Sequence, residues 1–366
     1  SAVEAQTLST NLDDIMFTED IQAVLSKAQD EIEVQLTEGN ILTAQTLLYY
    51  LRTFYEGTSR RDLFDSWNDK LEEVALKVSL LRQYAPEHLH QLFVARAEIL
   101  GDDSPEAFNE QAKDNWIERV DGIDKNMVVR SLDIASTEHI SDVSWSDLIK
   151  GGLDAVYNLG NVPVIAETFE HVSNEARRNA WKSAVEDEIE SYNEYLEHIP
   201  GKRVLIQTLT RLLKANDRTI KLPESVLLRE FGDGAMSTLD KYSAIIWPDE
   251  SRRFEQQTEG RFVGVGIVIK ENNKGEIMVV KPIEGAPAYE GGVQPDDVII
   301  AVNGKSSSGW SLNDAVDRIT GPKGTAVTLT IKRNGLAKPL DILLSRDTIK
   351  LHSVQGWWKE GLDEEG

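Results

Sequence analysis

The feature that most constrains the fold of this 366-residue chain is a change in hydrophobic period near Tyr242. Before that residue, apolar side chains recur every three or four positions, which is the spacing of helices with one buried face. After it they alternate with polar residues, Gly and Pro become frequent, and β-branched residues dominate, as in short strands. We therefore predict a multidomain α+β protein with an all-α N-terminal region followed by a small β-rich domain.

Composition narrows the classes of function. Hydrophobic residues make up 40% of the chain and charged residues 28%, which is typical of a globular protein. The net charge of −23, with the acids spread along predicted helices, leaves no basic stripe for phosphates, so we expect no nucleic-acid partner. The absence of cysteine excludes disulfides and thiolate metal sites. The sequence contains no run of about 18 apolar residues, so we predict no transmembrane helix.

The histidines predict no metal site. The chain has six, and they are scattered. His88 and His90 are two positions apart on a predicted helix, so their side chains point to different faces. We expect neither a metal nor a cofactor.

Helical spacing marks most of the N-terminal region, residues 1–224. The predicted helices cover residues 18–36, 41–51, 63–81, 86–99, 104–116, 173–199, 204–214 and 223–231. Ser104 followed by Pro105 is a typical cap and first turn. The pattern from 127 to 169 is mixed, so two helical subdomains with a break near 121–172 are an open alternative. Short loops between helices predict antiparallel neighbours.

The β-rich region is predicted to hold short strands and two helices. The strands are expected over residues 263–269, 277–281, 297–302, 327–331 and 340–344, and the helices over 286–289 and 312–319. Asn-Gly at 334–335 is a typical hairpin turn. Such a content predicts a small sandwich or partly open barrel with a helix beside one edge.

One stretch of this region carries a functional signal. Gly264-Val265-Gly266-Ile267 leads from a glycine-rich turn directly into a strand. Such a turn can aim consecutive backbone N–H groups at an anion, and a free strand edge can accept an extended peptide. We predict that the N–H groups of Val265, Gly266 and Ile267 bind a peptide's terminal carboxylate. Arg261 would add positive charge, or is simply a solvated surface residue.

The predicted peptide groove continues along the strand and onto the helix over 312–319. Its apolar residues are expected to be Val268, Ile269, Leu312, Ala315, Val316 and Ile319. The alternative for the helical residues is simple core packing, since one helix face can serve both purposes.

A series of motifs in this region, taken in order, resembles a PDZ domain, and more narrowly that of the C-terminal processing (tail-specific) serine proteases. The motifs are Leu239-Asp240-Lys241-Tyr242-Ser243, Phe262-Val263-Gly264-Val265-Gly266-Ile267, Gly285-Ala286-Pro287-Ala288, Gly292-Val293, Asp297-Val298-Ile299, Val302-Asn303-Gly304, Ile319-Thr320-Gly321-Pro322-Lys323-Gly324-Thr325, Ile331-Lys332-Arg333-Asn334-Gly335 and Arg346-Asp347-Thr348-Ile349. Lys241 departs from the family, which usually has Pro there. The resemblance implies a helical linker over 225–259, a PDZ domain over 260–346 and the start of a linker to a protease domain over 347–366.

The resemblance implies a function for the chain. It would be the substrate-recognition and regulatory portion of a serine-type endopeptidase, binding free C-termini of peptides or proteins for cleavage by a Ser/Lys domain. We recognise no such dyad here, since Ser306-Ser307-Ser308 lacks the family's pattern, so the chain alone is expected to be inactive.

The implied partners are peptide or protein C-termini and the protein's own protease domain, and a homo-oligomer is left open. The implied location is extracytoplasmic, in a bacterial periplasm. The alternative function is a non-enzymatic PDZ adaptor or scaffold.

Overall fold

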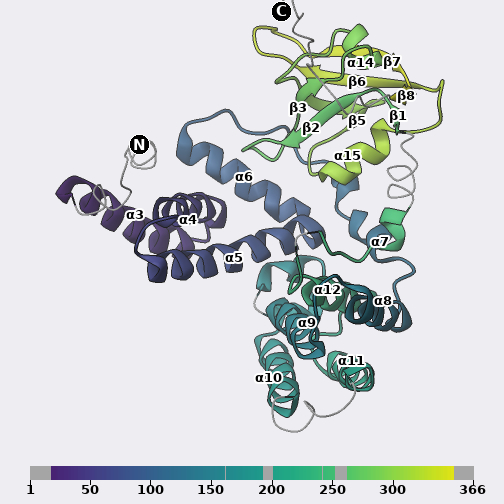
Figure 1. Cartoon of the computed structure of the whole chain (residues 1–366). Helices are drawn as coiled ribbons and strands as arrows, with labels where there is room; N and C mark the ends of the chain where they lie inside the picture. Colours follow the sequence, from purple (N-terminus) through teal and green to yellow (C-terminus); the bar gives the residue numbers. More distant parts are fainter. Residues whose placement is uncertain (1–17, 161, 193–200, 241, 252–261, 350–366) are drawn as a thin grey trace, which may run out of the picture. The chain divides into compact units, whose positions relative to one another are not determined.

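The structure is a computed structural model that describes residues 18–160, 162–192, 201–240, 242–251 and 262–349. The chain divides into two units, a helical one that comprises Ser1–Ser251 with Asn273–Gly275, and a β-rich one that comprises Arg252–Asn272 and Glu276–Gly366 (Figure 1). The predicted fold class, a helical region followed by a small β-rich domain, is confirmed. Each unit is described by itself.

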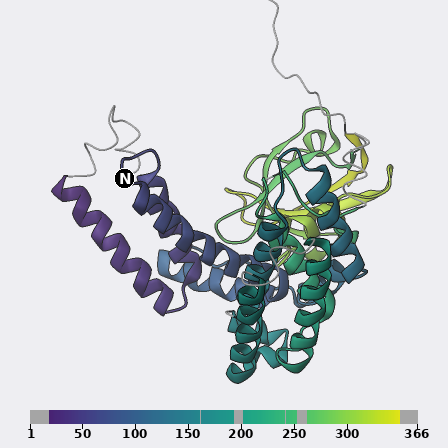
Figure 2. The ribbon, with the colours of Figure 1, turned by 60° about the horizontal axis from the view of Figure 1, so that its bottom comes forward.

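The helical unit begins with helices that lie side by side. These are α3 (Glu19–Thr37), α4 (Ile41–Tyr55) and α5 (Arg61–Tyr84), followed by α6 (Pro86–Leu100). α4 packs against both α3 and α5 (Figures 1 and 2). α6 starts at a proline and ends before Gly101, which adopts the left-handed conformation favoured at helix C-termini. The four helices predicted here from apolar spacing are confirmed.

The next prediction, a helix from Ser104 through Trp116, is wrong at its start. Residues 102–109 are not helical. The chain instead forms the short 3₁₀ helix η1 (Glu110–Ala112) and then α7 (Asn115–Val120). The ring of Trp116 packs edge-on against Tyr84 and Phe169. Burial of this aromatic side chain, rather than the local capping signal, decides where the chain becomes helical.

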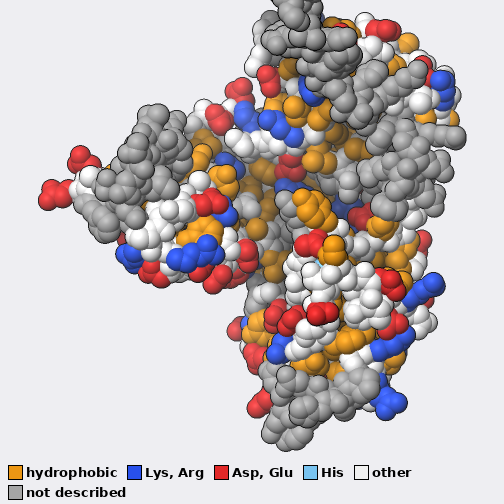
Figure 3. Space-filling model, in the orientation of Figure 1, with side chains coloured by type: hydrophobic (Ala, Val, Ile, Leu, Met, Phe, Trp, Pro, Cys, Tyr) orange, Lys and Arg blue, Asp and Glu red, His pale blue; other side chains and the backbone are white. Residues whose placement is uncertain are grey.

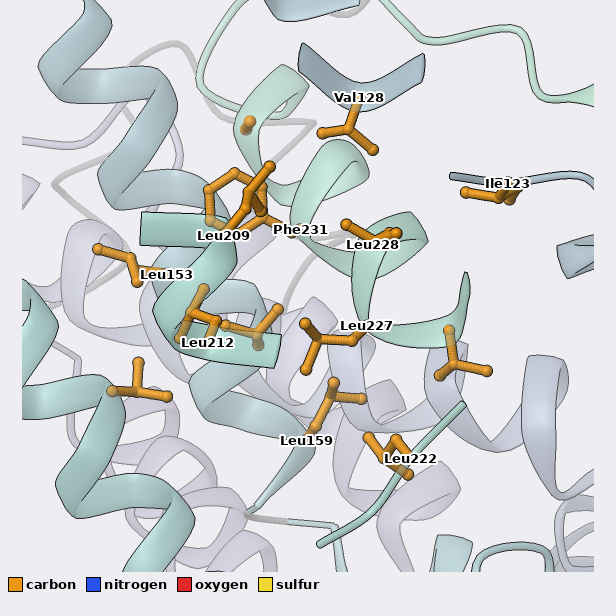
Figure 4. Packing of buried hydrophobic residues seen from close by; sticks show 14 of the residues in the cluster. Ile123, Val128, Leu153, Leu159, Leu209, Leu212, Leu222, Leu227, Leu228 and Phe231 are labelled. Carbon is orange, nitrogen blue, oxygen red and sulfur yellow. The ribbon is translucent and has the colours of Figure 1, made fainter. Parts of the chain in front are cut away.

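The remaining helices of this unit enclose one core. They are α8 (Lys125–Glu138), α9 (Trp145–Leu159), α10 (Glu175–Ser191), α11 (Gly201–Arg218) and α12 (Glu224–Met236), with the 3₁₀ helices η2 (Pro163–Glu167) and η3 (Glu170–Ser173). Figure 4 shows Leu153 of α9, Leu209 of α11 and Phe231 of α12 converging. The break expected near 121–172 and the linker expected over 225–259 both contain residues of this core.

Glycines bring α9 and α12 unusually close together. A Cβ atom added to Gly234 of α12 would lie 2.3 Å from the Cβ of Ala155 and 2.6 Å from the carbonyl oxygen of Gly151, both on α9. Real Cβ atoms do not approach other heavy atoms this closely. The two helices therefore contact each other through backbone at this point.

Gly234→Ala is expected to destabilise the helical unit, although Ala is intrinsically a better helix former than Gly by about 1 kcal/mol. The extra methyl group must push α9 and α12 apart, and overpacking of this kind costs about 1–3 kcal/mol. Chemical denaturation followed by circular dichroism measures the change. A more stable Gly234→Ala variant would contradict the close contact of these helices.

The β-rich unit contains a six-stranded antiparallel sheet and a two-stranded ribbon. The strands are β1 (Phe262–Gly264), β2 (Ile267–Glu271), β3 (Ile277–Pro282), β4 (Val298–Val302), β5 (Lys305–Ser306), β6 (Ala326–Lys332), β7 (Leu340–Ser345) and β8 (Asp347–Ile349), and the helices are α14 (Pro287–Glu290) and α15 (Leu312–Ile319). The sheet order is β2-β3-β4-β6-β7, with β5 on β4, and β1 pairs with β8. β2 is therefore an edge strand of the sheet.

The core of this unit follows the strand alternation, in which every second side chain points inward. Val327, Leu329 and Ile331 of β6 are all fully buried. An ion pair joins the buried Asp297 to the partly exposed Arg333, which donates to both carboxylate oxygens at 2.6 and 2.7 Å. The strands predicted over 277–281, 297–302, 327–331 and 340–344 are confirmed, whereas the single strand predicted over 263–269 is interrupted at residues 265 and 266 and forms β1 and β2. β5 and the pairing of β1 with β8 are findings of the structure.

Candidate functional site

The loop between β1 and β2 is held by its carbonyl groups and by one buried side chain. The N–H of Ala288 donates to the carbonyl oxygen of Val265, and the N–H of Ile283 donates to that of Gly266, both at 2.8 Å. The side chain of Val265 is only 1% exposed. Gly266 has a φ of 76°, in the left-handed region that favours glycine. The loop carbonyls therefore face the domain interior.

The loop N–H groups have no such partners. Among the hydrogen bonds of the described residues, none is donated by the N–H of Val265 or of Gly266. Ile267 lies opposite Pro282 of β3, and the bond from Ile283 to Gly266 makes this a non-hydrogen-bonded pair. The N–H and C=O of Ile267 therefore point to the free edge of β2. Consecutive N–H groups beside a left-handed residue form an anion-binding nest.

Two side chains lie directly under the loop. A Cβ atom added to Gly266 would be 2.2 Å from the Cβ of Ala286 and 3.2 Å from the Cδ1 of Ile349. Position 266 therefore requires glycine for two reasons: its φ lies in the left-handed region, and no room is left for a Cβ atom. Sequence reasoning assigned neither Ala286 nor Ile349 to the site, although both lie in motifs that carry the family resemblance.

The predicted groove residues of β2 fall on two faces of the strand. Ile267 and Ile269 are half-buried, and Val268 between them is 40% exposed. Side chains alternate along a strand, so Ile269 shares a face with Ile267, while the side chain of Val268 points to the opposite face. The N–H and C=O of Val268 point toward β3, because those of Ile267 point to the free edge and the direction alternates along a strand. α15 packs beside β2 (Figure 1).

The predicted groove residues of α15 also separate by burial. Leu312 and Val316, one turn apart, are half-buried. Ala315 and Ile319 are 1% and 4% exposed and belong to the core. The accessible apolar surface of this helix is therefore provided by Leu312 and Val316.

A buried arginine fastens the C-terminal end of α15. Arg346 is 8% exposed and donates from Nε to the carbonyl oxygen of Ile319 at 2.8 Å and from Nη2 to that of Arg318 at 3.0 Å. Its Nη1 donates to the carbonyl oxygen of Ala326 on β6 at 2.9 Å. Burial lowers the pKa of Arg346. Arg346 satisfies the last carbonyls of α15 and fixes that helix to the sheet, a role that its sequence motif did not reveal.

Three further expectations concern charge, metal ions and membranes. Arg261, the predicted additional charge, lies outside the described residues. Within the part of the chain that the structure describes, no cluster of His, Asp and Glu side chains could hold a metal ion. In the same residues, no helix combines the length and apolar character that crossing a membrane requires.

The comparisons with known proteins bear on this unit. Residues 253–332 match the family model of the PDZ domain. This segment is a PDZ domain. The loop from Val265 to Ile267 and the edge of β2 thus belong to a PDZ domain.

The chain is similar to C-terminal processing proteases over part of its length. It is 44% identical over 124 residues to the Carboxy-terminal-processing protease of Bartonella bacilliformis, which is 34% of this chain and 28% of that protein. It is 38% identical over 133 residues to the Carboxy-terminal processing protease CtpA of Bacillus subtilis, or 35% of this chain and 28% of that protein. The chain therefore spans little more than a quarter of these relatives.

A solved structure is also similar. The PDZ domain of the Carboxy-Terminal Protease from Vibrio cholerae, in complex with peptide, is 30% identical, with a TM-score of 0.23. The match covers 25% of this chain and 99% of that one. The PDZ domain predicted from the motifs and its relationship to the C-terminal processing proteases are confirmed.

Proposed function

We propose that the PDZ domain binds free peptide C-termini. The observation that carries this proposal is a nest of N–H groups, at Val265, Gly266 and Ile267, placed at the start of a free strand edge. A terminal carboxylate accepts hydrogen bonds from these groups, and the peptide chain adds to β2 as a further strand. The names of the relatives, carboxy-terminal processing proteases, support a ligand of this kind.

The groove sets a first condition on the ligand. Alternate side chains of an added strand point to the same face, so the last and the third-last residues of the peptide both face α15. There they meet the half-buried Leu312 and Val316 and, from β2, Ile267 and Ile269. These ligand residues are apolar in our proposal, because burial against aliphatic side chains stabilises apolar groups.

The wider role follows from the family. We propose that the chain is the substrate-recognition and regulatory portion of a C-terminal processing serine peptidase, and that a Ser/Lys domain performs the cleavage. Similarity to proteases of this class over about a third of the chain supports this assignment. The periplasmic location implied by the resemblance stays a prediction.

Amidating the ligand's C-terminus is expected to weaken its binding by about ten-fold or more, because hydrogen bonds to a charged acceptor are worth about 1.5–3 kcal/mol. The measurement is isothermal titration calorimetry with two peptides of identical sequence, one with a free carboxylate and one amidated. We expect a Kd of about micromolar for the free form. Equal affinities for the two peptides would rule out the carboxylate nest.

A further inference from the structure

The face of β2 and β3 that points away from α15 carries unpaired positive charge. Val268 and Lys270 of β2 point to this face and are exposed. In the antiparallel register, Val268 lies opposite Lys281, and Lys270 lies opposite Met278. Among the described residues, the side chain of Lys270 takes part in no hydrogen bond or ion pair. In Figure 3, blue and orange side chains lie together in the region where Figure 1 labels β2 and β3.

The geometry of the loop sets the direction of a bound peptide. The nest precedes β2, so a C-terminus held there lies at the start of β2 and the rest of the peptide extends toward Glu271. The peptide strand is therefore antiparallel to β2. The irregularity between β2 and β3 places the extra residue, Val280, in β3. The alternation along β2 itself is intact.

This direction assigns each ligand residue to a neighbour on β2. Ile267 lies beside the last residue of the peptide. Ile269, two positions further along β2, lies beside the third-last residue. Val268 then lies beside the second-last residue and Lys270 beside the fourth-last. Directly opposed residues of neighbouring strands have Cβ atoms about 5 Å apart, within reach of a Lys ammonium and a carboxylate.

We propose that Lys270 is a specificity-determining residue that selects Asp or Glu at the fourth-last position of the ligand. This inference rests on the proposed binding of free C-termini to β2. The preferred ligand thus combines an acidic residue on the outer face with apolar residues at the last and third-last positions. On a chain with a net charge of −23, a free cation beside the ligand edge offsets the general repulsion of acidic peptides.

The test uses the full chain and two free-C-terminal peptides that differ only by Glu or Gln at the fourth-last position. Calorimetry at low ionic strength is expected to give about three-fold tighter binding of the Glu peptide, since an exposed cross-strand ion pair contributes about 0.2–1 kcal/mol. Lys270→Met is expected to abolish this preference, and Lys270→Glu to reverse it. Lys305→Glu, on β5, makes the same change in net charge away from β2 and is expected to keep it.

Each outcome has a definite meaning. Equal binding of the two peptides by the wild-type chain would overturn the role of Lys270 while leaving C-terminus binding intact. If Lys305→Glu and Lys270→Glu lose the preference for the Glu peptide to the same extent, that preference depends on net charge and not on Lys270. This result would also overturn the inference. Failure of both peptides to bind would instead refute the proposed function.

Discussion

Gly266→Ala is expected to weaken the binding of a free-C-terminal peptide by about ten-fold or more, because losing even one hydrogen bond to a charged carboxylate costs about 1.5–3 kcal/mol. The new Cβ would lie 2.2 Å from the Cβ of Ala286, so the loop backbone has to move. Movement turns the N–H groups of Val265 and Ile267 away from the carboxylate. The substitution is also expected to destabilise the PDZ domain. Calorimetry measures the affinity, and thermal unfolding measures the stability.

Two further variants separate backbone strain from the steric clash. Gly285 has a φ of 73° but no neighbour within 4 Å of an added Cβ, so Gly285→Ala carries only the strain of a left-handed alanine, about 1–2 kcal/mol. Adding Ala286→Gly to Gly266→Ala removes the clashing methyl group and is expected to recover part of the affinity. If Gly266→Ala binds peptide as well as Gly285→Ala does, the loop is not the carboxylate site.

The free energy of unfolding of the helical unit is expected to fall by about 3 kcal/mol between pH 4.5 and 7, because a pKa shift of one unit corresponds to about 1.4 kcal/mol. The group responsible is Glu230 of α12, which is 8% exposed and accepts a 2.7 Å hydrogen bond from the hydroxyl of Tyr84. Burial raises the pKa of Glu230 from 4.5 to about 7.

The sign of the effect follows from proton binding. The folded state holds the Glu230 proton more tightly than the unfolded state does. The stabilisation is complete below pH 4.5, where both states are protonated, and is lost as the pH rises through about 7. Burial also raises the pKa of Asp233 to about 6, but its side chain is 45% exposed and its smaller contribution has the same sign.

Glu230→Gln is expected to remove most of this pH dependence and to stabilise the helical unit above pH 7. The glutamine keeps an acceptor oxygen for Tyr84 without a buried charge. Urea unfolding followed by circular dichroism at several pH values measures the effect. Glu118→Gln, an exposed position on α7, is the matched control and should keep the wild-type slope. Parallel stability curves for wild type and Glu230→Gln would contradict this assignment.

Helix positions were predictable where the apolar period and a glycine or proline agree, as for α4 and α6. These signals are local, because they depend on residues within one or two turns. The stretch from Ser104 to Trp116 was predicted wrongly, since Trp116 packs against residues distant in sequence. The glycine turn at 264–267 was recognisable because its spacing alone requires a special backbone conformation.

The sequence by itself determined that a helical region precedes a PDZ domain and where the glycine turn lies. Both could be predicted because the period of the apolar residues and the spacing of the glycines are patterns within a few neighbouring residues. Only the tertiary structure placed Ala286 under Gly266 and Arg346 at the end of α15. It also brought Tyr84 to Glu230 across 146 positions of the chain. These contacts depend on how distant segments pack, and no local pattern of residues encodes that.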